Sequence, residues 1–199
     1  KNMVKTVMEE WQEPDNGIWE IRNETAHFVL SKVMSWVALD RACGIAQLLH
    51  EDQYAERWRL AADEIKAHIH TNGWKDTIHS FSQTYENNEL DASLLLMESY
   101  GFIDGMDERY IATVQAIEKH LKHNGLLFRY RNRDDFGEPT SAFTICSFWL
   151  VRALFVTGRQ EEALALFNEL LKYANHLGLY SEDLDFETKA QLGNFPQAY

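Results

Sequence analysis

Six segments of the sequence carry apolar side chains at helical spacing, and they alternate between two kinds: 26–49, 54–69, 91–100, 107–122, 141–157 and 160–175. The first, third and fifth segments are apolar almost all round. The other three keep a single apolar stripe and are otherwise charged. A helix that is apolar on every side is buried, whereas a helix with one stripe lies at the surface. The pattern therefore predicts three helical hairpins, each an inner helix followed by an outer helix.

This alternation predicts an all-α fold and leaves its architecture open. Inner and outer helices in turn are typical of a two-layer helical toroid or of a solenoid of hairpins. An ordinary helical domain in which some helices are simply more central fits the same pattern. A tetratricopeptide-like scaffold fits less well, because such repeats recur about every 34 residues, whereas the inner helices here start near residues 26, 91 and 141. We treat residues 1–199 as one domain.

Composition and charge narrow the class of partners. The 199 residues include 19 Lys and Arg against 31 Asp and Glu, a formal charge of -12. Nucleic acid is not an expected partner, because phosphate binding depends on basic residues. A membrane is not expected either, since the most apolar run, 142–155, is shorter than the roughly 20 residues that span a bilayer. Cys43 and Cys146 lie in apolar surroundings, which favours a reduced, cytoplasmic protein.

Long polar connections precede the inner helices, at residues 14–25, 73–90 and 125–140, and another covers 178–195. Loops of this length are uncommon in compact domains and are often functional. In an inner/outer arrangement, the loops that enter inner helices open at the same end. We therefore expect their polar residues to converge.

These loops bring aromatic and charged side chains together. The first contains Trp19 and Glu20, the third contains Arg129 and Tyr130, and the last contains Glu182. Aromatic faces can cover the C–H surfaces of a sugar, and two carboxylates on opposite sides of it can act as acid and base. Each residue also has a structural interpretation: a solvated carboxylate, a core tryptophan, or an arginine in a surface ion pair.

Neither a metal nor a cofactor is expected from the sequence. His68 and His70, like His120 and His123, are close pairs that lack further ligands at zinc-site spacing. There is no glycine-rich phosphate loop.

Several separated motifs occur in an order that points to a known family: DNGIWEIR at 15–22, SKVM at 31–34, ALDR at 38–41, LDASLL at 90–95, RY at 129–130, SFWL at 147–150, GLYSE at 178–182 and LGNFPQ at 192–197. Together they resemble glycoside hydrolase family 15, which includes glucoamylase, glucodextranase and trehalase-type enzymes. The resemblance covers essentially the whole chain. One departure is Ile21, where glucoamylases often place a second acidic residue.

The resemblance implies a fold and a set of roles. The family fold is an (α/α)6 toroid, of which three hairpins form roughly half, so the chain is expected to be the C-terminal half of a catalytic domain. By motif, Glu20 corresponds to the general acid and Glu182 to the general base. Trp19, Arg129 and Tyr130 correspond to sugar-binding residues. In an inverting enzyme the carboxyl groups lie roughly 6.5–9.5 Å apart, and the acid is expected to be buried against an aromatic side chain such as Trp19.

The functional hypothesis is therefore an inverting, exo-acting α-glucosidase that acts on an α-linked glucose oligosaccharide or disaccharide. The linkage stays open among α-1,4, α-1,6 and α,α-1,1. With half a toroid, we expect the isolated chain to be weakly active or inactive and to associate with itself through exposed inner-helix surface. The alternatives are a non-catalytic helical-hairpin scaffold and a degenerate homologue that binds sugar without cleaving it.

Overall fold

The computed structural model describes residues 1–22, 25–135 and 137–197, and helices dominate it. The helices are α1 (Asn2–Glu10), α2 (Val29–Leu48), α3 (Asp52–Asn72), α4 (Leu96–Ser99), α5 (Glu108–Leu121), α6 (Thr144–Val156) and α7 (Gln160–Leu170), with 3-10 turns η1 (Ala92–Leu95) and η2 (Leu171–Tyr173). The all-α prediction is confirmed. Helix α1 was not among the predicted elements.

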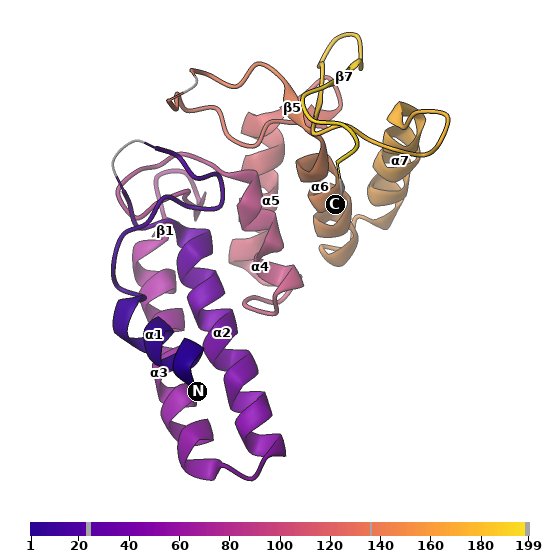
Figure 1. Ribbon diagram of the computed structural model, residues 1–199. Coiled ribbons are helices and arrows are strands. Elements are labelled where there is room, and N and C mark those ends of the chain that lie inside the picture. The colour runs from indigo at the N-terminus through magenta and orange to yellow at the C-terminus, as the bar shows by residue number, and fades with distance from the viewer. Residues whose placement is uncertain (23–24, 136, 198–199) are drawn as a thin grey trace.

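The first and last hairpins match the predicted inner and outer pairs. Helices α2 and α3 lie side by side, as do α6 and α7, and α5 stands between the two pairs (Figure 1). Helix α2 buries side chains around most of its circumference, whereas α3 buries one stripe, which consists of Ala55, Trp58, Ala62, Ile65 and Ile69. The apolar pattern along the sequence therefore sets which helix of the pair is inner.

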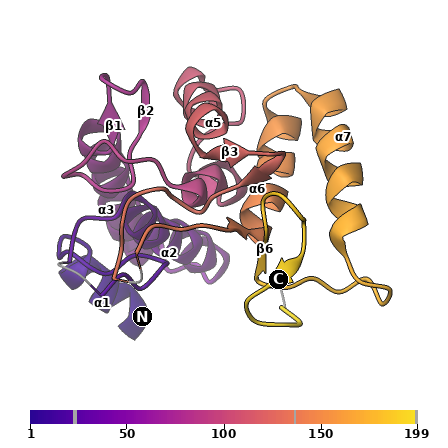
Figure 2. The same ribbon diagram turned by 90° about the horizontal axis from the view of Figure 1, so that it is seen from above.

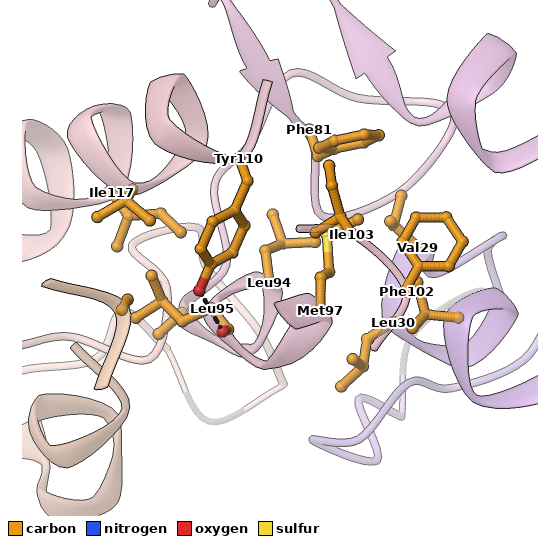
Figure 3. Close-up of a cluster of buried hydrophobic side chains, with 14 of the residues drawn as sticks. Val29, Leu30, Phe81, Leu94, Leu95, Met97, Phe102, Ile103, Tyr110 and Ile117 are labelled. Carbon is orange, nitrogen blue, oxygen red and sulfur yellow. Dashed lines mark hydrogen bonds between the residues drawn. The ribbon is translucent and has the colours of Figure 1, made fainter. Parts of the chain in front are cut away.

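The middle inner segment differs from the prediction of one helix over 91–100. It is the 3-10 turn η1 followed by the single turn α4. The Asp91 side chain accepts a hydrogen bond from the Ser93 amide and caps the start, and Gly101, at φ +77°, follows the end. The segment is still the centre of the core, where Leu94, Leu95 and Met97 are fully or almost fully buried beside Tyr110 (Figure 3).

Short antiparallel strands close the long connections. The strands form the hairpin β1 (Trp74–Lys75) with β2 (Ser80–Phe81), the hairpin β3 (Lys122–His123) with β4 (Leu126–Leu127), and a sheet of β5 (Ala142–Phe143), β6 (Asp183–Leu184) and β7 (Gln191–Leu192). In the sheet, Phe143 pairs with Asp183, and Asp183 pairs with Leu192. Strands and long loops gather at one end of the helices, as expected (Figures 1 and 2).

The outer edge beside α6 and α7 is apolar and exposed. Phe155, Leu164, Phe167 and Leu171 are each more than a third accessible. Over the residues that are described, no helix is both long and apolar enough to cross a membrane. Cys43 and Cys146 are buried and form no disulfide.

Candidate active site

The loop between α1 and α2 is tied at both ends. Asp15 and Ala26 exchange backbone hydrogen bonds of 2.9 and 3.0 Å. Oδ1 of Asp15 accepts from the Gly17 amide at 2.6 Å and from the Ser31 hydroxyl at 2.7 Å. Gly17 has φ +68°, and a Cβ there would lie 2.8 Å from the Phe28 ring. Only glycine satisfies both the turn and this close approach.

Inside this loop, Glu20 occupies a strained position. Its φ is +51°, and an L-residue in the left-handed region carries a penalty of roughly 1–2 kcal/mol. Asn16 closes the turn around it with two hydrogen bonds. The Asn16 side-chain amide donates to the Ile21 backbone carbonyl at 2.6 Å, and the Asn16 backbone carbonyl accepts from the Ile21 backbone amide at 3.1 Å. Strain of this kind persists only where the surroundings over-determine it.

The expected burial of Glu20 is wrong for this chain, because Glu20 is exposed. The turn directs the preceding residue, Trp19, into the protein, where its indole Nε1 donates to Asp91 Oδ2 at 2.8 Å. Glu20 follows within the tight turn, and its side chain is exposed to solvent.

Trp19 is the centre of an aromatic cluster drawn from two loops, one strand and one helix. Its ring centroid lies 5.3 Å from that of Phe143, 6.1 Å from that of Tyr130 and 6.1 Å from that of Trp149. The residue is half-buried, so one part of the indole is fixed by packing while another part stays accessible. Such a ring can offer a rigid platform to a flat apolar surface.

Asp91 anchors the cluster from below. It is 2% exposed and accepts hydrogen bonds from Trp19, from Gln83 Nε2 at 3.1 Å and from the Ser93 amide at 2.8 Å. Burial raises the pKa of Asp91, and the hydrogen bonds act in the opposite direction. Because all three donors converge on it, Asp91 fixes the orientation of the indole.

Arg129 and Tyr130 share a second buried carboxylate, Asp134. Arg129 Nη2 lies 3.1 Å from Asp134 Oδ2, and the Tyr130 hydroxyl donates to the same oxygen. The guanidinium stands 5.0 Å from the Tyr130 ring and 6.0 Å from the Trp19 ring. Arg129 Nε is buried and has no hydrogen-bond partner within the described part of the chain.

Glu182 immediately precedes β6 and is held by side chains of the following segment. Its Oε2 accepts from the Asn194 side-chain amide at 2.9 Å and from the Asn194 backbone amide at 3.3 Å, and its Oε1 lies 3.4 Å from Gln197 Nε2. Gly193, at φ +72°, lets the chain pass close by, since a Cβ there would be 3.0 Å from Oε2. The carboxylate is thereby fixed in direction.

The sheet links Glu182 to the aromatic cluster. Asp183, the next residue, pairs with Phe143, whose ring packs against Trp19. The backbone carbonyl of Glu182 also accepts from the Thr144 amide at 2.9 Å. The structure therefore brings Trp19, Arg129 and Tyr130 into one cluster, with Glu182 directly before the adjoining strand β6 and Glu20 exposed next to Trp19 in the chain.

Four residues of this cluster were not singled out from the sequence: Asp91, Asp134, Phe143 and Trp149. Asp91 and Trp149 lie inside the quoted motifs LDASLL and SFWL, so the signal was present but carried no role. Asp134 and Phe143 showed none beyond their place in or next to a long loop.

Two further observations concern metal binding and a surface cavity at this end of the helices. In the described ranges, no group of three or more His, Cys, Asp or Glu side chains is arranged to hold a metal ion. A surface cavity of about 530 Å³ opens at the same end of the helices, lined by residues 77–79, 88–90, 119–121 and Arg131. It contains none of the five predicted site residues.

Comparison with known proteins now identifies the family. The sequence model of glycosyl hydrolases family 15 matches residues 1–199. The chain belongs to glycoside hydrolase family 15. This membership confirms the resemblance carried by the motifs.

Curated relatives of this family-15 chain agree with that assignment. The chain is 45% identical over 202 residues to the trehalase of Mycolicibacterium smegmatis, covering 100% of the chain and 30% of that protein. It is 40% identical to the trehalase of Thermoplasma acidophilum, covering 100% of the chain and 34% of that protein. It therefore spans about a third of the length of these relatives.

Solved glycosidases share the fold at low sequence identity. A wild-type glycosidase and a glycosidase in complex with glucose each superpose with a TM-score of 0.78 at 18% identity, covering 91% of this chain and 47% of theirs. The match supports the helical toroid class of fold.

Proposed function

We propose that this chain supplies both catalytic carboxylates of an inverting, exo-acting α-glucosidase, with Glu20 as general acid and Glu182 as general base. Trehalose is the substrate we propose first, because the relatives cited above are trehalases. Ile21, where glucoamylases often carry a second acid, also favours a substrate other than starch.

One observation carries the proposal: the loops of both carboxylates meet in the packing of Trp19. The residue before Glu20 packs at 5.3 Å against Phe143, and Phe143 pairs with the residue after Glu182. Arg129 stands over the same rings. Hydrolysis of a glycosidic bond uses two carboxyl groups that flank this bond, and the shared packing supports Glu20 and Glu182 as that pair.

The proposed reaction assigns a task to each group. The sugar ring lies on the accessible part of Trp19, and Arg129 donates to its hydroxyls. Glu20 gives a proton to the glycosidic oxygen as the bond to the anomeric carbon breaks. Glu182 takes a proton from a water that attacks this carbon on the opposite face. Each turnover of trehalose then yields one β-glucose and one α-glucose, and the two carboxyl groups end with each other's protonation state.

The test is glucose release from trehalose, maltose and isomaltose. It is run on the 199-residue chain and on a chimera in which the chain replaces the matching region of the Mycolicibacterium smegmatis trehalase. General acid–base catalysis contributes about 10²- to 10⁴-fold, so Glu20→Gln and Glu182→Gln are expected to lose that factor. Glu89→Gln, an exposed loop carboxylate at the same end, is the matched control. A folded chimera that releases no glucose, or that is indifferent to either substitution, would overturn the proposal.

We propose further that the isolated chain is weakly active or inactive and associates with itself. The apolar groove between α6 and α7, about 530 Å³ and lined by Phe155, Leu164 and Phe167, supports this, since patches of this kind are typical of interaction surfaces. Light scattering should give a mass above that of one chain, and Phe167→Ser should reduce it. A monomeric mass together with full turnover would contradict the idea. The cytoplasmic location stays a prediction.

A further inference from the structure

The loop that carries Trp19 and Glu20 rests on the first turn of α2 through two polar anchors. Ser31 donates to Asp15 Oδ1 at 2.7 Å, and the ammonium group of Lys32 donates to the Glu13 carbonyl. Ser31 and Lys32 are consecutive residues of the helix. The two acceptors, Asp15 and Glu13, precede the tight turn in the chain. Helix α2 therefore holds the loop just before the chain reverses direction.

Lys32 is unusual for a packing residue, because it is 2% exposed. Burial lowers the pKa of Lys32, and the carboxylates of Asp15, Glu86 and Glu13 act in the opposite direction. Removing an ammonium group from water is costly unless it is hydrogen-bonded, and the Glu13 backbone carbonyl accepts a hydrogen bond from this one. The chain keeps this charge where an apolar side chain would fill the same space.

The Trp19–Asp91 hydrogen bond holds the turn at Trp19, and the segment that enters the turn needs a hold of its own. Asn16 and Ile21 close the turn from within, but they do not fix it relative to the helices. The strain at Glu20, φ +51°, would relax if the loop could shift. A proton donor must also keep its place, because a misplacement of about 1 Å can cost about 10²-fold in rate.

We propose that Asp15, Ser31 and Lys32, here called the loop clamp, are positioning residues that hold the Trp19–Glu20 turn in its left-handed geometry against α2. The inference rests on the proposed function, in which Glu20 is the acid. The clamp touches no substrate and acts through the turn alone.

The experiment monitors the environment of Trp19, a residue of the turn, by ¹⁹F NMR in the 199-residue chain. The chain is labelled with 5-fluorotryptophan, which gives one ¹⁹F resonance for each of its six tryptophans, and Trp19→Phe assigns that of Trp19. Asp15→Ala and Ser31→Ala are expected to shift or broaden the Trp19 resonance while the others stay in place. Asp15→Asn retains an oxygen that can accept both hydrogen bonds and is expected to restore it.

A matched control lies on the same helix. The Ser35 hydroxyl donates to the Ser31 carbonyl at 3.1 Å, so Ser35→Ala removes a similar bond without touching the loop and should leave the resonance unchanged. In whichever preparation hydrolyses trehalose, Asp15→Ala is expected to lower kcat about 10- to 100-fold with little change in KM, and Asp15→Asn should recover it.

Two outcomes overturn the clamp: a Trp19 resonance that stays in place in both Asp15→Ala and Ser31→Ala, or a shift shared by all six tryptophans, which would mean general loosening. Because the resonance needs no turnover, this test fails separately from that of the proposed function. Hydrolysis retained in Glu20→Gln would overturn the role of Glu20 and leave the resonance result intact.

Discussion

The two loops that present Glu20 and Glu182 hold their carboxylates in different ways. In the first loop the backbone is fixed, through the Asp15–Ala26 bridge and the closed turn, and no described side chain binds the Glu20 carboxylate. In the second loop the carboxylate itself is fixed, by Asn194 and Gln197. Substitutions around Glu182 should therefore act through lost side-chain contacts, and those around Glu20 through backbone geometry.

The largest expected effect separates the two carboxylates by chemistry. Fluoride leaves a sugar without being protonated, so α-glucosyl fluoride needs the base and not the acid. Both Glu20→Gln and Glu182→Gln should lose about 10²- to 10⁴-fold on trehalose, but only Glu182→Gln should lose fluoride release, measured with an ion-selective electrode. Equal behaviour on the fluoride would mean that the roles do not differ as proposed.

A pair of glycines tests how closely Glu182 is held. Gly193 and Gly178 have φ of +72° and +77°, yet a Cβ would meet Glu182 Oε2 at 3.0 Å in the first case and nothing within 4 Å in the second. Gly193→Ala and Gly178→Ala should share a backbone cost of roughly 1 kcal/mol, visible as a similar drop in Tm. Only Gly193→Ala should also lower kcat, by about tenfold. Equal kcat values would show that Glu182 tolerates displacement.

Stability should respond to the two sites with opposite signs. Asn tolerates the left-handed region, so Glu20→Asn should raise the free energy of unfolding by about 0.5–1 kcal/mol while abolishing turnover. Glu182→Asn leaves the Asn194 and Gln197 donors without their acceptor and should lower it by about 1 kcal/mol. Urea unfolding measures both. A loss of stability in Glu20→Asn would argue against strain at that residue.

The smallest expected effect concerns two acids that follow Glu182. Burial raises the pKa of Asp183, whereas hydrogen bonds from Thr188 lower the pKa of Asp185. A carboxyl group with a raised folded pKa adds stability only at low pH, and this is lost as the pH rises through that pKa; a lowered pKa has the reverse effect. As the pH rises from about 3 to 7, the free energy of unfolding of Asp183→Asn should increase relative to that of the natural chain. That of Asp185→Asn should decrease relative to it. Curves of the same sign would contradict the assignment.

Much of the helical framework could be predicted because helical periodicity is local. Helices α2, α3, α5, α6 and α7 were each found within a few residues of their bounds. The exception, 91–100, is so short that an Asp91 cap and Gly101 leave room for only a 3-10 turn and one α-turn. Its burial was predicted correctly although its helix type was not.

The candidate site likewise has features that could be predicted from the sequence and features that could not. The sequence by itself determined which residue types stand in which loops, the alternation of inner and outer helices, and the motifs that carry the family. Only the tertiary structure decided that Trp19 donates to Asp91, 72 residues away, that Arg129 pairs with Asp134, and that Glu20 lies exposed on a strained turn. Apolar periodicity is a property of a single helix, whereas the partner of a buried polar group depends on how each loop folds and on how distant segments pack together.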